Sequence, residues 1–232
     1  MKNIKIQEAF EREINMLDND LEKPASTDTE YWVNSGILKF VKTRFTGNNY
    51  KGIGFEQTQK RIDDLRLLET SVDIKVGDNQ RVELPNGYMY LLGDRVGILP
   101  TDGDNKCWNK DMDGEFIIRY TDPLEATIET LDRMLENSLS EHNLKYCQAK
   151  PIKLMTGNTI QFYTDENYYV AEYKLYYLKK PATFSLNNPF DEYTSLPDEV
   201  LYECIKIAAQ MFIENKQSQR YNTITNEVNT ME

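Results

Sequence analysis

The spacing of the apolar residues changes twice along the chain, and this change constrains the fold more than any single motif. Over residues 1–70, and again over 195–217, apolar residues recur at the three- and four-residue spacing of amphipathic helices. Over 71–121 and 145–190, many of them alternate with polar residues, as in strands with one buried face. A chain of 232 residues can bury such faces without a metal or disulfide. The pattern predicts an α+β fold: a helical bundle with antiparallel β-hairpin and meander insertions.

The predicted bundle combines helices from both ends of the chain. A first helix is expected over about 3–20, a second from the capping box Thr27-x-x-Glu30 to Gly47, and a third over about 55–69. The last helix is expected to be capped by Ser195-x-x-Asp198. Its apolar stripe consists of Leu201, Cys204, Ile205, Ala208, Ala209 and Phe212.

The β portion is expected to contain two local antiparallel motifs. Segments 72–76 and 82–84 flank a turn-like Gly77-Asp78-Asn79, which predicts a β-hairpin. Strands near 152–154, 160–162 and 168–178 are predicted to form a three-stranded meander. A helix is expected over 122–142, with Asp122 as N-cap and Pro123 at its first helical position.

The charge excludes several classes of partner. The chain has 27 Lys and Arg against 38 Asp and Glu, a formal net charge of −11. Reading DNA sequence, or binding an anionic membrane surface, requires a basic surface. No segment approaches the roughly 18 apolar residues of a membrane span, and Glu8, Glu11 and Glu13 interrupt the run that a signal peptide needs. An acidic chain is still compatible with enclosing DNA that must slide without sticking.

The sequence offers little for catalysis or metal binding. Three widely spaced cysteines, an odd number without a CxxC pattern, argue against a disulfide framework and favour small buried apolar residues in a reducing cytoplasm. The single histidine, His142, is expected to cap the helix over 122–142. No nucleotide, zinc-protease or nucleophile motif is present, so we predict no catalytic, cofactor-binding or metal-binding residues.

An acidic loop over 101–115 is the one candidate for a cation. It matches the first half of an EF-hand, but its twelfth position is Tyr120, where a bidentate Glu is required. Turn chemistry in a solvated loop is the favoured interpretation. A calcium site of another kind remains an alternative, with the ligands Asp102, Asp104, Asp111 and Asp113.

Tyrosine is unusually frequent, with 15 residues, several of them in the predicted strand 168–178. One face of this strand is expected to be core, and the other is too apolar for a solvated surface, which suggests a covering partner. A sugar platform is an alternative use of such rings. The polar segment 218–232 is expected to be a flexible tail. The candidate interface residues are Tyr168, Val170, Tyr176, Leu178, Arg220, Tyr221, Ile224 and Val228.

Three segments together carry a family resemblance. They are LPNGYMYLLGDRVGI at 84–98, the meander at 149–186 that contains Tyr-x-x-Lys-Pro, and the closing helix SLPDEVLYECIKIAAQ within 195–221. In this order they resemble the portal-adaptor or ring proteins, the head-to-tail connectors, of crAss-like tailed bacteriophages. The resemblance covers about 84–100 and 149–221.

The resemblance implies a non-enzymatic virion protein without cofactors. Many copies, twelve in the implied arrangement, would form a homo-oligomeric ring in the phage neck that joins the portal to the tail. The portal and adjacent ring or tail proteins would be its partners, DNA would be only passing cargo, and no membrane would be involved. Assembly would occur in the host cytoplasm. The excess acid is then expected to face the DNA channel. Alternatives are another tail-hub or tail-completion protein, and a carbohydrate-binding module that uses the tyrosine-rich sheet.

Overall fold

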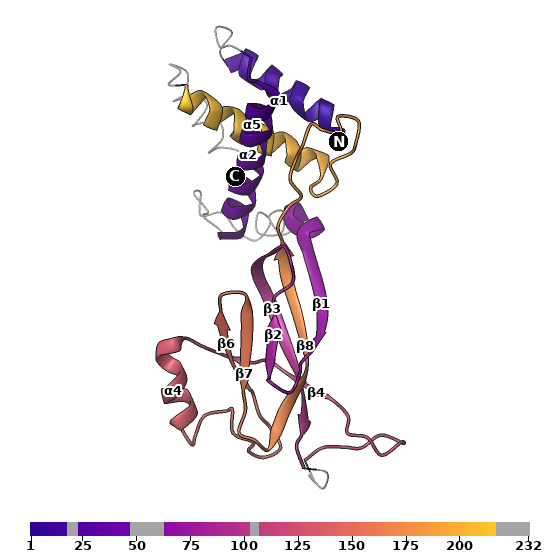
Figure 1. Cartoon of the computed structure of the whole chain (residues 1–232), viewed down its shortest axis with the longest axis vertical. Coiled ribbons are helices and arrows are strands. Elements are labelled where there is room, and N and C mark those ends of the chain that lie inside the picture. The colour runs from indigo at the N-terminus through magenta and orange to yellow at the C-terminus, as the bar shows by residue number, and fades with distance from the viewer. Residues whose placement is uncertain (18–22, 47–62, 103–106, 217–232) are drawn as a thin grey trace. The chain divides into compact units, whose positions relative to one another are not determined.

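A computed structural model describes residues 1–17, 23–46, 63–102 and 107–216 (Figure 1). The chain divides into two compact units. Met1–Leu68 and Lys180–Glu232 form the helical unit, and Glu69–Lys179 form the β unit. Helices and two largely antiparallel sheets are both present, so the predicted α+β class is confirmed.

The described helices of the helical unit are α1 (Asn3–Leu17), α2 (Ser26–Thr46) and α5 (Asp198–Asn215), with the short 3-10 helix η1 (Arg66–Leu68). Helix α5 packs against both α1 and α2. Its whole predicted apolar stripe is buried, as expected. A Cβ atom on Gly36 of α2 would lie 2.7 Å from the carbonyl oxygen of Cys204 and 2.8 Å from Cβ of Ala208. Glycine therefore allows the backbones of α2 and α5 to approach closely.

Both N-caps predicted in the helical unit are wrong, and Glu30 and Ser195 instead bind segments distant in sequence. Helix α2 begins at Ser26, so Thr27 lies inside it, and the carboxylate of Glu30 accepts hydrogen bonds from the backbone N–H of Leu186 and the hydroxyl of Ser185. Pro197 is the N-cap of α5, while the hydroxyl of Ser195 accepts a 3.1 Å hydrogen bond from the N–H of Ala182. Local spacing could not reveal these long-range partners.

The predicted third helix lies mostly outside the described residues. Residues 63–65 are helical, but Glu69 already begins a strand, so the helix does not continue to that position.

The β unit contains two four-stranded sheets. The first has the order β1 (Glu69–Lys75), β8 (Tyr168–Lys179), β3 (Tyr88–Pro100) and β4 (Arg119–Thr121). The second has the order β2 (Arg81–Glu83), β7 (Thr159–Tyr163), β6 (Ile152–Thr156) and β5 (Leu124–Ala126). Strands β5 and β6 are parallel, and the other pairs are antiparallel.

The predicted strand pairings are largely wrong, although most of the strands exist. Strand β1 pairs with β8 and β2 pairs with β7, so the predicted hairpin is divided between the two sheets. Strands β6 and β7 do form a hairpin, but β8 belongs to the other sheet, so the predicted meander does not form. Alternating residues indicate that a segment is extended, whereas its partner is chosen by contacts distant in sequence.

The predicted helix over 122–142 is also wrong in most of its length. Leu124–Ala126 form strand β5, and helix α4 covers only Ile128–Glu136, with Thr127 as its N-cap. Residues after Asn137 form successive turns rather than helix. The parallel pairing of β5 with β6 supplies hydrogen bonds that a first helical turn would otherwise need.

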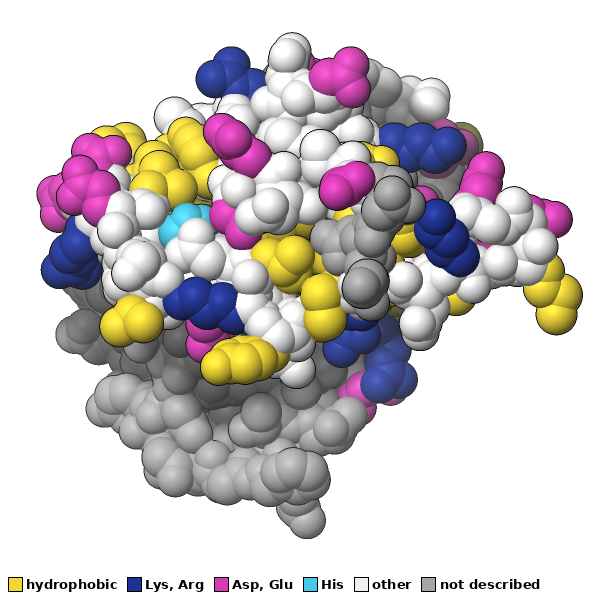
Figure 2. All heavy atoms as spheres, turned by 90° about the horizontal axis from the view of Figure 1, so that it is seen from below, with side chains coloured by type: hydrophobic (Ala, Val, Ile, Leu, Met, Phe, Trp, Pro, Cys, Tyr) yellow, Lys and Arg dark blue, Asp and Glu magenta, His cyan; other side chains and the backbone are white. Residues whose placement is uncertain are grey.

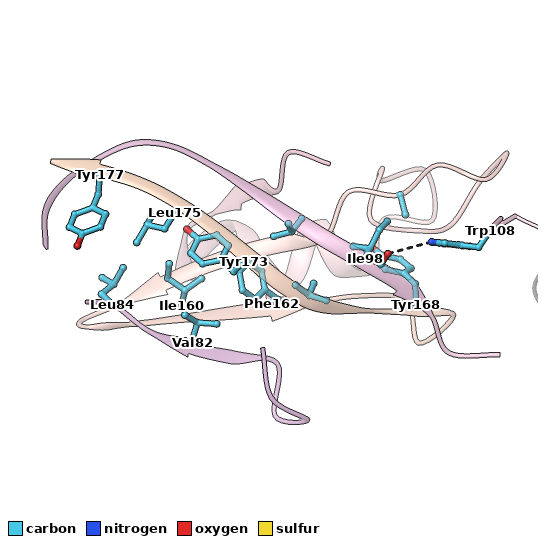
Figure 3. Close-up of a cluster of buried hydrophobic side chains, with 13 residues drawn as sticks. Val82, Leu84, Ile98, Trp108, Ile160, Phe162, Tyr168, Tyr173, Leu175 and Tyr177 are labelled. Carbon is cyan, nitrogen blue, oxygen red and sulfur yellow. Dashed lines mark hydrogen bonds between the residues drawn. The ribbon is translucent and has the colours of Figure 1, made fainter. Parts of the chain in front are cut away.

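The core of the β unit lies between its two sheets (Figure 3). Figure 3 shows Phe162 of β7 facing Tyr173 of β8, with their ring centroids 5.2 Å apart. Gly97 of β3 pairs with Glu172 and Ile98 pairs with Val170, so one extra residue interrupts the register of β8. Such a β-bulge reverses which residues face the core.

The bulge explains why the predicted outer face of the last strand is wrong. Tyr168 and Val170 lie in the core before the bulge, and Tyr173, Leu175 and Tyr177 lie in the core after it. Two predicted interface residues, Tyr168 and Val170, are therefore buried in this core. A third, Leu178, is also buried, although the bulge does not account for it. Tyr176 is 45% exposed and remains accessible. The other four, Arg220, Tyr221, Ile224 and Val228, lie outside the described residues.

Candidate protein-binding surfaces

The turns that follow α4 carry strongly exposed apolar side chains in the β unit. Tyr146 is 99% exposed and Leu139 is 82% exposed. Together with Arg119 and Lys150, they border a cleft of about 460 Å³. We call the group Arg119, Leu139, Lys145, Tyr146 and Lys150 the Tyr146 surface. An exposed aromatic ring beside a cleft is typical of a binding surface, because its burial by a partner is favourable.

Tyr146 is displayed by a strained backbone turn. Lys145 and Gln148 exchange two backbone hydrogen bonds, of 3.0 and 2.8 Å, which close a two-residue loop. Both residues between them have positive φ, 48° at Tyr146 and 64° at Cys147. Glycine and asparagine are the usual residues in such turns. Positive φ at two residues with larger side chains costs about 1–3 kcal/mol each, so the surroundings must hold the turn.

A disulfide holds one side of the turn. Cys147 is bonded to Cys107, with 4.9 Å between their Cα atoms. The expectation of three unpaired cysteines is therefore wrong for these two, whereas Cys204 is free and buried as predicted. The two bonded cysteines are 40 residues apart, and only the folding of the β unit brings them together.

Arg119 holds the same turn from the other side. Its guanidinium group donates hydrogen bonds to the carbonyl oxygens of Cys147 and Cys107, the latter at 2.7 Å. The group also lies 4.9 Å from the ring centre of Trp108, whose indole N–H donates to the carbonyl of Ile98 at 3.4 Å (Figure 3). These contacts connect the turn to the core of the β unit.

The Tyr146 surface is basic, although the whole chain is acidic. Arg119 and Lys145 donate hydrogen bonds to carbonyl oxygens, which are neutral and leave the positive charges uncancelled. Lys150 forms a 2.7 Å ion pair with Glu141, the one carboxylate among the residues that line the cleft. Figure 2 shows basic, acidic and hydrophobic side chains side by side on the face that it presents. The chemistry fits an acidic partner with an apolar contact.

His142 lies beside this surface but is structural. Its side chain is buried, and its carbonyl oxygen accepts a 2.7 Å hydrogen bond from the hydroxyl of Tyr168. The predicted helix-capping role is wrong, because α4 ends at Glu136. Burial lowers the pKa of His142 below its usual value, so the imidazole favours its neutral form.

Among the described aromatic side chains of the helical unit, Phe190 is the most exposed, at 72%. We call the group Phe190, Asp191, Glu192, Asp198 and Glu199 the Phe190 surface, and all five residues are exposed. The carboxylate of Asp198 accepts a 2.7 Å hydrogen bond from the N-terminal ammonium group. The surface carries four carboxylates against two neighbouring cations, this ammonium group and Lys2, which forms a backbone bridge with Glu192, and it also exposes the ring of Phe190.

The acidic loop shows the turn chemistry that the sequence favours. One carboxylate oxygen of Asp111 accepts hydrogen bonds from the backbone N–H groups of Asp113 and Glu115, each at 2.9 Å. Asp104, one of the alternative calcium ligands, lies outside the described residues. In the described part of the chain, no group of three His, Cys, Asp or Glu side chains is arranged to hold a metal ion.

The sequence did not reveal the Tyr146 surface for identifiable reasons. Leu139 fell on the apolar side of a helix that does not extend to it, and Tyr146 stood in a segment without periodicity. The pairing of Cys107 with Cys147, which would have drawn attention to the turn, has no signature in their spacing.

Comparison with known proteins gives no identification. The sequence matches no known protein family, and no curated protein is recognisably similar to it. Within the described residues, no helix has the length and apolar character needed to span a membrane.

Proposed function

We propose that this chain is a non-enzymatic structural protein of a tailed bacteriophage, which forms a ring in the neck between portal and tail. The observation that carries the proposal is the display of Tyr146, fully exposed on a turn that a disulfide and Arg119 hold in place. Rigid exposed aromatic rings are typical anchors of protein interfaces. The resemblance of segments 84–98, 149–186 and 195–221 to phage ring proteins supplies the biological setting.

In this proposal the two units have different roles. Helices α1, α2 and α5 form the bundle of the ring subunit, and the β unit is the insertion that reaches partners. Segment 218–232 acts as a docking arm on the portal or the next ring. About twelve copies, the number that the resemblance implies, surround the DNA, which passes without specific contacts because the chain carries a net charge of −11.

A carbohydrate-binding module remains an alternative with a smaller set of tyrosines on the strand 168–178. Tyr168 lies in the core, whereas Tyr169 and Tyr176 are 41% and 45% exposed. A tail-hub or tail-completion role would use similar surfaces and differs by its position in the particle.

The test mixes the purified full chain with assembled portal and images the product by electron microscopy. We expect a ring of extra density on the portal. A chain that ends after Lys216 retains every described helix and strand, and we expect it to bind the portal at least tenfold more weakly. A folded full chain that binds neither portal nor neighbouring neck components, and is absent from purified virions, contradicts the proposal.

The channel offers a separate test of the proposed role. If the rings conduct DNA, the excess carboxylates should concentrate on the inner wall, and residues 101–115 are candidates for it. A predominantly basic wall in a structure of the assembled neck would contradict this part of the proposal.

A further inference from the structure

We propose that the Tyr146 surface of one copy docks on the Phe190 surface of the next copy around the ring. This inference rests on the proposed function and adds the contact between neighbouring subunits. The occupant of each surface is a second copy of this chain.

The Phe190 loop is ordered enough to act as a docking site. Asn3 at the start of α1 donates from its backbone N–H to the carbonyl of Asp191 at 2.9 Å. Its side-chain amide donates to the carbonyls of Ser185 and Asn188, both at 3.1 Å. The hydroxyl of Tyr193 donates to the carbonyl of Ala182 at 2.8 Å. Phe190 is thus held out from a fixed loop, and little conformational entropy would be lost on binding.

The charges of the two surfaces are complementary. Segment 187–199 contains four acidic residues and no Lys or Arg. The N-terminal ammonium group pairs with Asp198, and Lys2 forms a backbone bridge with Glu192, so two cations lie beside these four carboxylates and an excess of negative charge remains. The Tyr146 surface presents three cations, two of which, Arg119 and Lys145, donate to neutral carbonyls. A basic patch on a chain of net charge −11 fits the acidic surface of another copy.

The arrangement favours a ring over a two-fold dimer. A two-fold contact through either surface would place like charges opposite each other, which is unfavourable. Pairing two different surfaces is head-to-tail, and such contacts generate closed rings when the rotation between copies closes. Aromatic residues in the centre with charges at the rim are also the usual distribution of binding energy in interfaces.

Photo-crosslinking tests the contact directly. Tyr146 is replaced by p-benzoylphenylalanine in the full chain, and equal amounts of ¹⁴N and ¹⁵N copies are mixed, irradiated and digested. We expect mixed-isotope crosslinks to the peptide that contains 187–199. The matched control carries the crosslinker at Tyr169, which is 41% exposed on the same unit, and should not label that peptide. Crosslinks within single copies, crosslinks to other peptides, or none at all overturn the proposal.

Charge reversal provides a second measurement. Lys145→Glu combined with Lys150→Glu should weaken association between copies by about tenfold or more. Sedimentation equilibrium or mass photometry of the wild-type and variant chains measures this change. Adding Asp191→Lys and Glu192→Lys should restore it. Unchanged tryptophan fluorescence shows that each variant is folded. The proposal is overturned if the double lysine variant associates as tightly as the wild type. It is also overturned if the four substitutions together do not restore association.

The outcomes separate this contact from the proposed function. If the chain binds the portal and enters virions but shows no crosslink between Tyr146 and 187–199, the proposed contact is contradicted and the proposed place in the neck stands. If the chain crosslinks as expected but never binds the portal, the contact stands and the place in the neck is contradicted.

Discussion

The two units bury charge in different ways. In the helical unit, Arg44 lies 2.6 Å from a carboxylate oxygen of Glu203 on α5 and 3.4 Å from one of Asp64, and most other buried side chains are apolar. In the β unit, Lys153 forms a 2.8 Å ion pair with Asp94, and the hydroxyl of Tyr173 donates to the same carboxylate at 2.9 Å.

The cluster of Lys153, Asp94 and Tyr173 joins the two sheets of the β unit. Lys153 lies on β6 in one sheet, whereas Asp94 and Tyr173 lie on β3 and β8 in the other. Burial and the charge of Asp94 raise the pKa of Tyr173, which keeps its hydroxyl protonated as a donor. The cluster therefore links the two sheets, while the helical unit is closed mainly by apolar stripes on adjacent helices. Both buried cations, Arg44 and Lys153, join separate elements, so the loss of either ion pair should destabilise its unit.

Each unit contains one tryptophan, so their stabilities can be measured separately. Trp32 lies on α2 and Trp108 lies in the β unit. A variant with Trp32→Phe leaves only Trp108, and its fluorescence during urea unfolding then follows the β unit. Trp108→Phe gives the matching reporter of the helical unit.

The largest expected effect is from Lys153→Met. The change leaves the carboxylate of Asp94 buried without its cation, so the free energy of unfolding of the β unit should fall by about 3–5 kcal/mol. Urea unfolding followed by Trp108 measures the change. The control Lys150→Met removes an exposed ion pair and should change the midpoint little. Equal losses in the two lysine variants would contradict the role assigned to the buried link.

Removing the disulfide should have the next largest effect. Cys107→Ser with Cys147→Ser opens a 40-residue loop and should lower the free energy of unfolding of the β unit by about 2–4 kcal/mol. Trp32 should report an unchanged helical unit. If the urea midpoint of the wild-type chain is the same with and without a reductant, the disulfide contributes little to the stability of the β unit.

Gly36→Ala tests how closely α2 and α5 pack in the helical unit. Its new Cβ would lie within 3 Å of two atoms of α5, so the helices must separate, at a cost of about 1–3 kcal/mol measured through Trp32. Gly93→Ala on β3 is the matched control, since no atom lies within 4 Å of the added Cβ. That variant should be neutral or gain about 0.5–1 kcal/mol. A neutral Gly36→Ala would contradict the close packing of α2 and α5.

The smallest effect concerns pH and should appear in the β unit. Burial lowers the pKa of His142 in the folded chain, so its contribution to stability is present above the unfolded pKa of about 6.5 and is lost as pH falls. The urea midpoint reported by Trp108 should therefore decrease between about pH 7 and pH 5.5. In His142→Asn the decrease should be smaller. An identical pH dependence in both chains would show that His142 does not contribute.

The sequence could predict the helical unit better than the β unit for a physical reason. Helical hydrogen bonds are local, so the apolar stripe from Leu201 to Phe212 correctly indicated both a helix and its buried face. Strand pairs join residues far apart, so alternation at Val72–Val76 and Tyr168–Leu178 identified strands but gave the wrong partners. A single extra residue in β8 then moved Tyr168 and Val170 from the predicted surface into the core.

The candidate surfaces depended on tertiary structure even more strongly. The exposure of Tyr146 requires a bond between cysteines 40 residues apart and an arginine that contacts both of them. The sequence by itself determined the α+β class, the helices of the N-terminal and C-terminal parts of the chain, the acidic charge and the buried face of α5. Only the tertiary structure decided the strand partners, the inter-sheet link through Lys153 and the display of Tyr146, because each depends on contacts between residues that local spacing does not relate.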